Sequence, residues 1–319
     1  MRREPKRLDV HSKRRREPAL SRLLRTRSRA MRAVVDTAAK LVDRDVSILI
    51  SGESGTGKNY LAEALHACGP RREAPFVTIE CASIPHELFE SELFGYEKGT
   101  FTDASARKIG KLEGARSGTT YFDEIAALTP PLQAKLLRAL EERRFTRLGG
   151  SENVAFHARV LSSTSTDLAG FRTDLLYRIN VVTLTIPPLR ERAEDVPLLA
   201  NEFLKKARKG ATFDAEAMEL LASYSWPGNI RELRNIVERA ALLSDSDVIG
   251  PASLPLDRLR EPAALVDAAT RNSWTLDQLE ERYIREVLRR TKENYSRAAE
   301  ILGINRKTLL EKRKKYGIS

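Results

Sequence analysis

The stretch 46–60, VSILISGESGTGKNY, limits the possible folds of this chain more than any other part of the sequence. It opens with an apolar, β-branched run that predicts a buried strand, and the apolar spacing after Lys58 predicts a helix. In a glycine-rich turn of this kind, backbone N–H groups converge on phosphate oxygens and the lysine reaches the β- and γ-phosphates. The stretch therefore predicts an α/β fold that binds a nucleoside triphosphate, with Asn59 where a Ser or Thr usually meets Mg²⁺. The turn has the spacing GxxxxGK and consists of Gly52, Glu53, Ser54, Gly55, Thr56, Gly57 and Lys58.

Two adjacent carboxylates end a second predicted strand. The segment 118–125, GTTYFDEI, carries Asp123 and Glu124 well downstream of the glycine-rich turn. In phosphate-loop ATPases one such carboxylate holds Mg²⁺ and the other orients and deprotonates the attacking water. A further strand over 158–163 ends in polar residues that include Ser165, a position from which a side chain could sense the γ-phosphate.

The charge of the chain is concentrated at its two ends. Residues 1–32 hold 13 lysines and arginines against three acidic residues, and residues 273–319 hold 12 against seven. Basic ends commonly bind nucleic acid, but a basic arm is also typical of a solvated, disordered tail or, less readily, of an organellar transit peptide. The two cysteines have no metal-ligand or disulfide spacing, and no apolar run is long enough to cross a membrane. We therefore expect a cytoplasmic protein of two or three domains.

Two further regions suggest contacts with partners. The loop 94–104, FGYEKGTFTDA, carries Tyr96 and Phe101, which either meet a partner or fold back onto the core. After a proline-containing linker, apolar spacing predicts three helices, in which Ser296 and Asn305 are expected N-caps and Gly303 permits a tight turn. This pattern predicts a basic helix-turn-helix, with a generic basic helical bundle as the alternative.

Seven motifs in order give the chain a family resemblance: GESGTGK, ESELFGYEKG, GTTYFDEI, FRTDLLYRINVV, PPLRER, EDVPLL and WPGNIREL. They resemble the central AAA+ domain of bacterial sigma-54-dependent transcription activators, and the C-terminal stretch is similar to that family's Fis-type helix-turn-helix. The resemblance implies a three-layer α/β AAA+ core with a helical lid, a small all-α DNA-binding domain, and a ring that is usually a hexamer. The implied organisation is a basic, disordered arm (1–29), an α/β subdomain (30–188), a lid (189–250), a linker (251–272) and the helix-turn-helix (273–319). The region before residue 30 is too short for a sensory domain.

The resemblance also implies roles for individual residues. ATP and Mg²⁺ are the implied cofactors, with Asp123 on the metal, Glu124 activating water, and Ser165 and Arg231 near the nucleotide from within the subunit. Arg172 and Arg178 match arginine fingers that reach a neighbouring subunit; helix-surface ion pairing is the alternative. The implied partners are DNA and sigma-54 RNA polymerase. The loop implied to touch sigma-54 is Gly99, Thr100, Phe101, Thr102, Asp103 and Ala104, and the implied DNA contacts are Ser296, Asn305, Arg306, Lys307, Thr308, Lys312, Arg313 and Lys315.

The chain departs from the family pattern at several of these positions. Thr100 and Asp103 replace the alanine and second glycine of the family's GAFTGA loop, and Glu80 replaces an asparagine that pairs with the catalytic glutamate. Ser165 replaces a sensor asparagine, and Asn59 replaces the glutamate that usually follows the lysine. These departures favour ATP binding over rapid hydrolysis, and hydrolysis over remodelling of sigma-54.

Three functions fit the sequence. The first is an ATP-driven activator of sigma-54 polymerase that assembles from dimers into a ring. The second is a DNA-binding regulator that binds ATP but no longer drives sigma-54. The third, an ATPase for other DNA work, is disfavoured because the partly kept 94–104 loop and the Fis-like tail indicate promoters.

Overall fold

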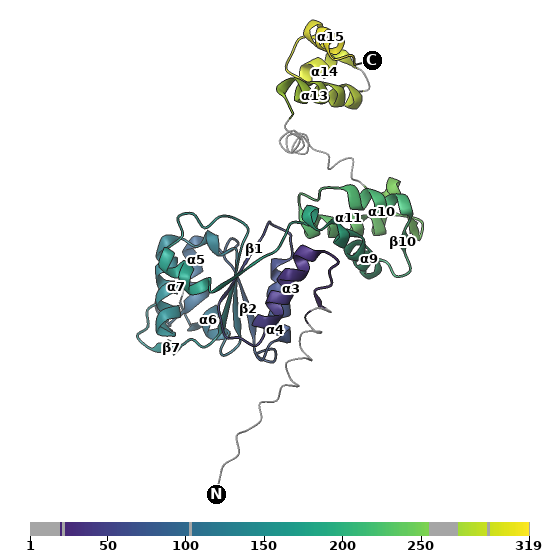
Figure 1. Ribbon diagram of the computed structural model, residues 1–319. Coiled ribbons are helices and arrows are strands. Elements are labelled where there is room, and N and C mark those ends of the chain that lie inside the picture. The colour runs from purple at the N-terminus through teal and green to yellow at the C-terminus, as the bar shows by residue number, and fades with distance from the viewer. Residues whose placement is uncertain (1–19, 21–22, 102–103, 255–273, 292–293, 319) are drawn as a thin grey trace. The chain divides into compact units, whose positions relative to one another are not determined.

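The computed structural model describes residues 20, 23–101, 104–254, 274–291 and 294–318 (Figure 1). It contains two compact units, Met1–Leu254 and Pro255–Ser319. Most of the predicted arm, most of the predicted linker, and Thr102 and Asp103 of the predicted sigma-54 loop lie outside the described residues.

A five-stranded parallel sheet forms the centre of the first unit. Because all its strands are parallel, their carboxyl ends meet at one edge of the sheet. Ser51 is paired in register with Thr164, and Glu80 with Asp123. The phosphate loop, the carboxylate pair and the polar end of the 158–163 strand therefore share that edge. In spatial order the strands are β2 (Phe76–Glu80), β5 (Thr119–Asp123), β8 (Arg159–Thr164), β1 (Ile48–Ser51) and β9 (Val182–Thr185).

Helices cover both faces of this sheet, which makes the predicted three-layer α/β core (Figure 1). Alternate residues of β1 point to opposite faces, so Ile48 and Ile50 join one apolar cluster while Leu49 joins the other. The first cluster includes α3 (Arg29–Leu41) and α4 (Lys58–Cys68). The second includes α5 (His86–Phe94), α6 (Lys111–Gly114), α7 (Pro130–Glu142) and α8 (Thr173–Ile179).

The lid is helical, as predicted. Trp226 lies in its core with 1% of its surface exposed and donates its indole N–H to the carbonyl of Leu221 at 2.9 Å, so this residue packs the lid. The lid contains the 3₁₀ turns η2 (Leu189–Glu191) and η3 (Ala193–Asp195), the helices α9 (Val196–Ala207), α10 (Ala215–Ser223) and α11 (Asn229–Leu243), and the short parallel pair β10 (Thr212–Phe213) and β11 (Val248–Ile249).

Short elements connect the larger ones. Two antiparallel pairs lie on the side of α5 and α7: β3 (Gly95–Tyr96) with β4 (Lys108–Ile109), and β6 (Arg144–Thr146) with β7 (Asn153–Ala155). The 3₁₀ turns η1 (Ile125–Ala127) and η4 (Pro251–Ser253) follow β5 and β11.

The second unit is the predicted three-helix domain: α13 (Leu276–Arg290), α14 (Tyr295–Ile301) and α15 (Arg306–Lys315). The side chain of Asn305 caps α15, as predicted. The prediction of Ser296 as an N-cap is wrong, because α14 begins two residues earlier than expected and Asn294 caps it. Ile301 on α14 and Leu310 on α15 are 52% and 43% exposed.

Two expectations about the whole chain can be compared with the described residues. Among them, no helix combines the length and apolar character needed to span a lipid bilayer. Cys68 and Cys81 are both buried and are free thiols, which agrees with the absence of disulfide spacing in the sequence.

Candidate active site

The glycine-rich turn wraps the amino end of α4. Gly57 adopts the left-handed φ of 101° that starts the helix, and a Cβ at Gly55 would stand 2.4 Å from the carbonyl oxygen of Gly228 in the lid. Both positions therefore require glycine. The Lys58 side chain is only 5% exposed, and its ammonium donates to the carbonyls of Gly52 at 2.9 Å and Glu53 at 3.3 Å. The lysine is thus held inside the turn.

Glu124 faces this lysine directly. Its Oε1 lies 3.0 Å from the Lys58 ammonium, and its Oε2 accepts hydrogen bonds from both the backbone N–H and the hydroxyl of Ser165, each at 2.8 Å. The Glu124 backbone has a φ of 54°, a conformation that costs energy in a residue with a Cβ and that is common at functional sites. Strand β5 ends one residue earlier, so this turn separates the direction of Glu124 from that of Asp123.

Asp123 belongs to a different set of hydrogen bonds. Its Oδ1 accepts from the Ser163 hydroxyl at 2.6 Å, and its Oδ2 accepts from the Asn59 amide at 2.9 Å. The hydroxyl of Tyr121 lies 3.1 Å from Asn59 Oδ1 and 3.2 Å from Asp123 Oδ1. The two carboxylates point apart, as the sequence predicts, and each is oriented by separate donors.

The residues at this edge fit a magnesium nucleotide. Mg²⁺ in phosphate-transfer sites is held by one or two carboxylates together with phosphate oxygens, so a full protein cage is not needed. Asp123 supplies one carboxylate beside the phosphate loop. Among the described residues, no group of three or more His, Cys, Asp or Glu could hold a metal ion alone.

The lid closes directly on the phosphate loop. The carbonyl of Gly55 accepts the backbone N–H groups of Ile230 at 2.9 Å and Arg231 at 3.3 Å, and the Arg231 guanidinium donates to the Ser54 hydroxyl at 2.8 Å. Asn229 is fully buried and donates to the Glu53 carboxylate and to the Ser54 carbonyl, both at 3.1 Å. Arg231 therefore lies beside the predicted phosphate turn.

An ion pair that we did not predict joins Glu53 to Arg190, in η2 at the start of the lid. Arg190 donates to both Glu53 oxygens, at 2.6 and 2.9 Å. These hydrogen bonds hold the pKa of the Glu53 carboxyl below its usual value, and Asn229 acts in the same direction. The sequence signal was available, because Arg190 lies in PPLRER and Asn229 in WPGNIREL, but neither motif shows which loop its polar residues meet.

Two buried charged residues near the start of the lid bind different segments of the chain. The Arg192 guanidinium, 3% exposed, donates to the Thr56 carbonyl at 2.7 Å. Burial lowers the pKa of Arg192, and the charge of Asp195 opposes this shift. Asp195, 1% exposed, accepts from the Thr26 hydroxyl at 2.7 Å and from the backbone N–H groups of residues 27 and 28 at 2.5 and 3.2 Å. Arg192 thus holds the phosphate loop, and Asp195 holds the segment before α3.

The two predicted arginine fingers bind residues of α7 and α8. Arg172 is exposed and makes a two-bond ion pair with Asp174 (3.1 and 2.7 Å), while Arg178 donates to the carbonyl of Leu140 at 3.1 Å. The ion pairing that was our alternative for these arginines is present at Arg172. A role toward a neighbouring subunit remains a prediction.

Two departures from the family pattern have structural consequences here. Ser165 makes two hydrogen bonds to Glu124 despite its short side chain. Glu80 is exposed at the end of β2, and the described partners of the Glu124 carboxylate are Lys58 and Ser165 rather than residue 80. The hydrogen bonds that orient Glu124 therefore come from Ser165.

The base of the predicted sigma-54 loop is tied to the β6–β7 hairpin. The Thr100 hydroxyl lies 2.6 Å from the Glu97 carbonyl and 3.0 Å from the Leu148 carbonyl, and Gly149 leaves room for it. Gly99 donates to the Ala104 carbonyl at 2.8 Å. Phe101, 43% exposed, packs edge-on against the half-buried Tyr96, so the two aromatics contact each other at the loop base.

In the second unit, the predicted DNA contacts differ in how they are engaged. Arg306 and Lys307 are exposed at the start of α15, and Ser296 is exposed on α14. The Asn305 side chain is occupied with the backbone N–H and hydroxyl of Thr308, at 2.8 and 3.0 Å. Other basic residues bind within the domain: Lys312 pairs with Glu280 (2.6 Å), Arg313 with the Tyr295 hydroxyl (2.8 Å) and Lys315 with Asp277 (2.9 Å).

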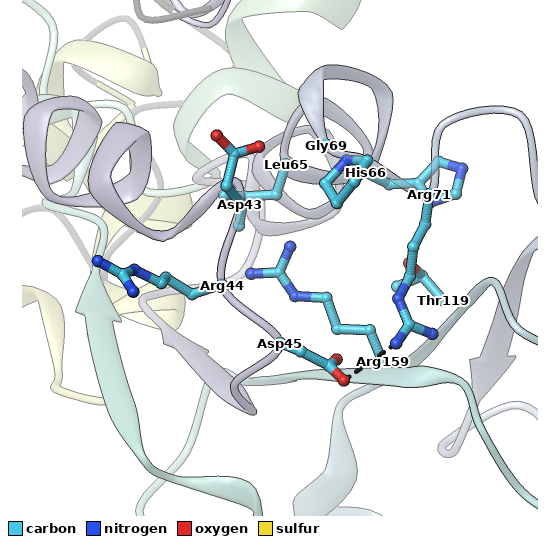
Figure 2. Close-up of a pocket in the computed structure, with 10 residues that line it drawn as sticks. Asp43, Arg44, Asp45, Leu65, His66, Gly69, Arg71, Thr119 and Arg159 are labelled. Carbon is cyan, nitrogen blue, oxygen red and sulfur yellow. Dashed lines mark hydrogen bonds and ion pairs between the residues drawn. The ribbon is translucent and has the colours of Figure 1, made fainter. Parts of the chain in front are cut away.

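A small pocket lies at the opposite, amino edge of the sheet (Figure 2). Thr119 and Arg159, the first residues of β5 and β8, line it together with His66, whose Nδ1 is 3.0 Å from the Thr119 hydroxyl. Its volume of about 40 Å³ has room for water but not for a nucleotide.

Three family models match the chain in order: the Sigma-54 interaction domain over residues 24–185, the AAA+ ATPase lid domain over 190–270, and the bacterial regulatory protein, Fis family, over 275–316. The regulatory protein AtoC of Escherichia coli is 43% identical over 311 residues, which cover 92% of this chain and 67% of AtoC. The transcriptional regulatory protein ZraR of Klebsiella oxytoca is 44% identical over 298 residues, covering 89% and 67%. Among solved structures, NtrX of Brucella abortus in complex with ADP is similar, with a TM-score of 0.68 and 34% identity over 96% of this chain and 72% of that one.

Proposed function

This chain belongs to the family of sigma-54-dependent transcriptional activators, with an AAA+ ATPase domain and a Fis-type DNA-binding helix-turn-helix, and we propose that it hydrolyses ATP with Mg²⁺ at the edge formed by Lys58, Asp123 and Glu124. The observation that carries the proposal is the contact of Glu124 with both Lys58 and Ser165. Support for the nucleotide comes from NtrX, which is known in complexes with ADP and with ATP.

The contacts of Glu124 suggest how it acts. A phosphate group attracts the Lys58 ammonium, which frees Glu124 Oε1 from its ion pair. Ser165 continues to hold Oε2, so the carboxylate keeps its orientation while Oε1 accepts a proton from the attacking water. Asp123 would hold the cation, which would supply positive charge to the phosphates, and Arg231 donates to Ser54 on the lid side of the same turn.

Arginines from a neighbouring subunit complete the site in this proposal. Arg172 is exposed and its partner Asp174 is an exposed neighbour in sequence, a pairing that is weak in water. A γ-phosphate in the adjoining subunit offers a stronger anion, and an arginine supplied in this way stabilises the charge of the transition state. The active form is therefore a ring, and Arg178 has the same role by its place in the family motif.

The outcome of hydrolysis is the remodelling of sigma-54 polymerase at promoters in the cytoplasm. The loop that begins at Gly99 contacts sigma-54, while Arg306 and Lys307 meet DNA from the start of α15. Because Lys312 and Lys315 already form ion pairs within the domain, Arg306 and Lys307 contribute more of the affinity for DNA. Replacing Arg306 and Lys307 by Ala should weaken DNA binding. It should also reduce the slope of the logarithm of the DNA-binding constant against the logarithm of salt concentration by about two, whereas Lys315→Ala should change this slope less.

Glu124→Gln is the direct test of the ATPase. The amide keeps an oxygen for Ser165 but cannot accept the proton of water, so ATP should bind while steady-state turnover is lost. Normal turnover by this variant would overturn the assignment. Arg72→Gln, a change in an exposed ion pair on the opposite edge, is the matched control and should leave turnover unchanged.

A regulator that binds ATP without driving sigma-54 is the second candidate. The hydrogen bonds of the Thr100 hydroxyl to Glu97 and Leu148 favour it, because they restrain the loop at its base. Transcription in vitro with sigma-54 polymerase separates the two, since only the first candidate yields ATP-dependent transcripts.

A further inference from the structure

Asn59 and Tyr121 form a small network on Asp123 that the proposed reaction does not require. Asn59 is the first residue after the phosphate-loop lysine and its side chain is exposed, whereas Tyr121 is 1% exposed within β5. The Asn59 amide donates to Asp123 Oδ2 at 2.9 Å. The other carboxylate oxygen, Oδ1, already accepts from Ser163 at 2.6 Å. Oδ2 is thus the oxygen left for a cation, and an amide group covers it.

The direction of the amide follows from the chemistry of its neighbours. An ionised carboxylate accepts hydrogen bonds and donates none, so Asn59 must turn its NH₂ group toward Asp123. Its carbonyl oxygen then faces the Tyr121 hydroxyl, which lies 3.1 Å away and can donate to it. If the amide were reversed, its oxygen would meet the carboxylate oxygen without a proton between them. Tyr121 therefore stabilises the one orientation that covers Oδ2.

We propose that Asn59, held by Tyr121, is a removable cap on the metal-binding oxygen of Asp123, and that it weakens the binding of the divalent cation. The inference rests on the proposed function, since it concerns the cation that accompanies ATP. For Oδ2 to become available, the Asn59 amide must rotate away, and the Tyr121 hydroxyl must exchange the amide oxygen for its other neighbour, Asp123 Oδ1 at 3.2 Å. Tyr121 is a positioning residue here, because it acts on the cation only through Asn59.

Metal binding to the full chain tests the inference without relying on turnover. Mn²⁺ binding is followed by electron paramagnetic resonance in the presence of a non-hydrolysable ATP analogue, and binding of the analogue itself is measured in EDTA. Asn59→Ala should tighten Mn²⁺ binding about fivefold, the factor that corresponds to one ordinary hydrogen bond. Tyr121→Phe should tighten it about twofold, because the amide remains but turns more freely. Neither change should alter binding of the analogue in EDTA.

Matched variants separate the network from general effects on the fold. Tyr60→Phe removes the same atom from an exposed tyrosine whose hydroxyl donates to the Leu23 carbonyl at 3.0 Å, and it should leave Mn²⁺ binding unchanged. Asn59→Ser, on the exposed start of α4, should tighten Mn²⁺ binding at least as much as Asn59→Ala, because a hydroxyl is a ligand that Mg²⁺ and Mn²⁺ accept.

The opposite results have distinct meanings. Weaker Mn²⁺ binding in Asn59→Ala would make the asparagine a ligand of the cation and overturn the inference. Mn²⁺ binding that is normal in the unaltered chain and unchanged in both variants would also overturn it while leaving the proposed function intact. A chain that binds neither the analogue nor Mn²⁺ would overturn both.

Discussion

Replacing Asp195 by Ala should destabilise the first unit strongly. The carboxylate is 1% exposed and accepts three hydrogen bonds from residues 26–28. Its removal leaves the Thr26 hydroxyl and the backbone N–H of Arg27 without their acceptor. A hydrogen bond to a charged group contributes about 1.5–3 kcal/mol, so we expect a loss of about 4 kcal/mol in the free energy of unfolding. Asp195→Asn retains one acceptor oxygen and should cost about half as much.

Equilibrium unfolding in urea measures this change. A Trp274→Phe background leaves Trp226, in the lid core, as the only tryptophan, so its fluorescence reports the first unit. Glu194→Ala removes an exposed carboxylate one residue away and should shift the free energy of unfolding by less than about 0.5 kcal/mol. If Asp195→Ala cost less than about 1 kcal/mol, the reasoning that this carboxylate holds the segment before α3 through its three hydrogen bonds would be refuted.

Three further predictions follow from other sites. Burial lowers the pKa of His66 below its usual 6.5, so the unfolded chain takes up the proton first as the pH falls, and the free energy of unfolding should decline below about pH 6.5. His66→Gln should reduce the dependence of the free energy of unfolding on pH, as urea titrations at several pH values can measure. An unchanged pH dependence would contradict the assignment. Burial raises the pKa of the thiols of Cys68 and Cys81, so a thiol reagent at pH 8 should label neither until the chain is unfolded, as mass spectrometry can check. Thr100→Ala combined with Asp103→Gly should raise sigma-54-dependent transcription by releasing the loop, whereas unchanged output would favour a regulator that only binds ATP.

The sequence predicts the fold well because its strongest signals are local. The apolar run before the glycine-rich turn, and the strand that ends at Asp123, each carry their own periodicity and their own terminating residues. Parallel strands bring those ends to one edge, so the meeting of Lys58 with Glu124 follows from topology alone. Local rules fail where two candidates compete, as at α14, where Asn294 rather than Ser296 caps the helix.

Interactions between distant segments are beyond this reasoning. Asp195 meets residues that precede it by more than 160 positions, and nothing in either segment's periodicity indicates the partner. The same holds for Arg190 with Glu53. The sequence also presents Lys312 and Lys315 as equal to Arg306, because it contains no information on which cations find carboxylates within the folded domain.

Open-complex formation at a sigma-54 promoter tests the central claim most directly. Purified chain, sigma-54 polymerase and promoter DNA are mixed with ATP, and promoter melting is followed with permanganate. Our account predicts melting with the unaltered chain and ATP, and none with Glu124→Gln or with a non-hydrolysable analogue. Melting driven by Glu124→Gln to the same extent as by the unaltered chain would contradict it.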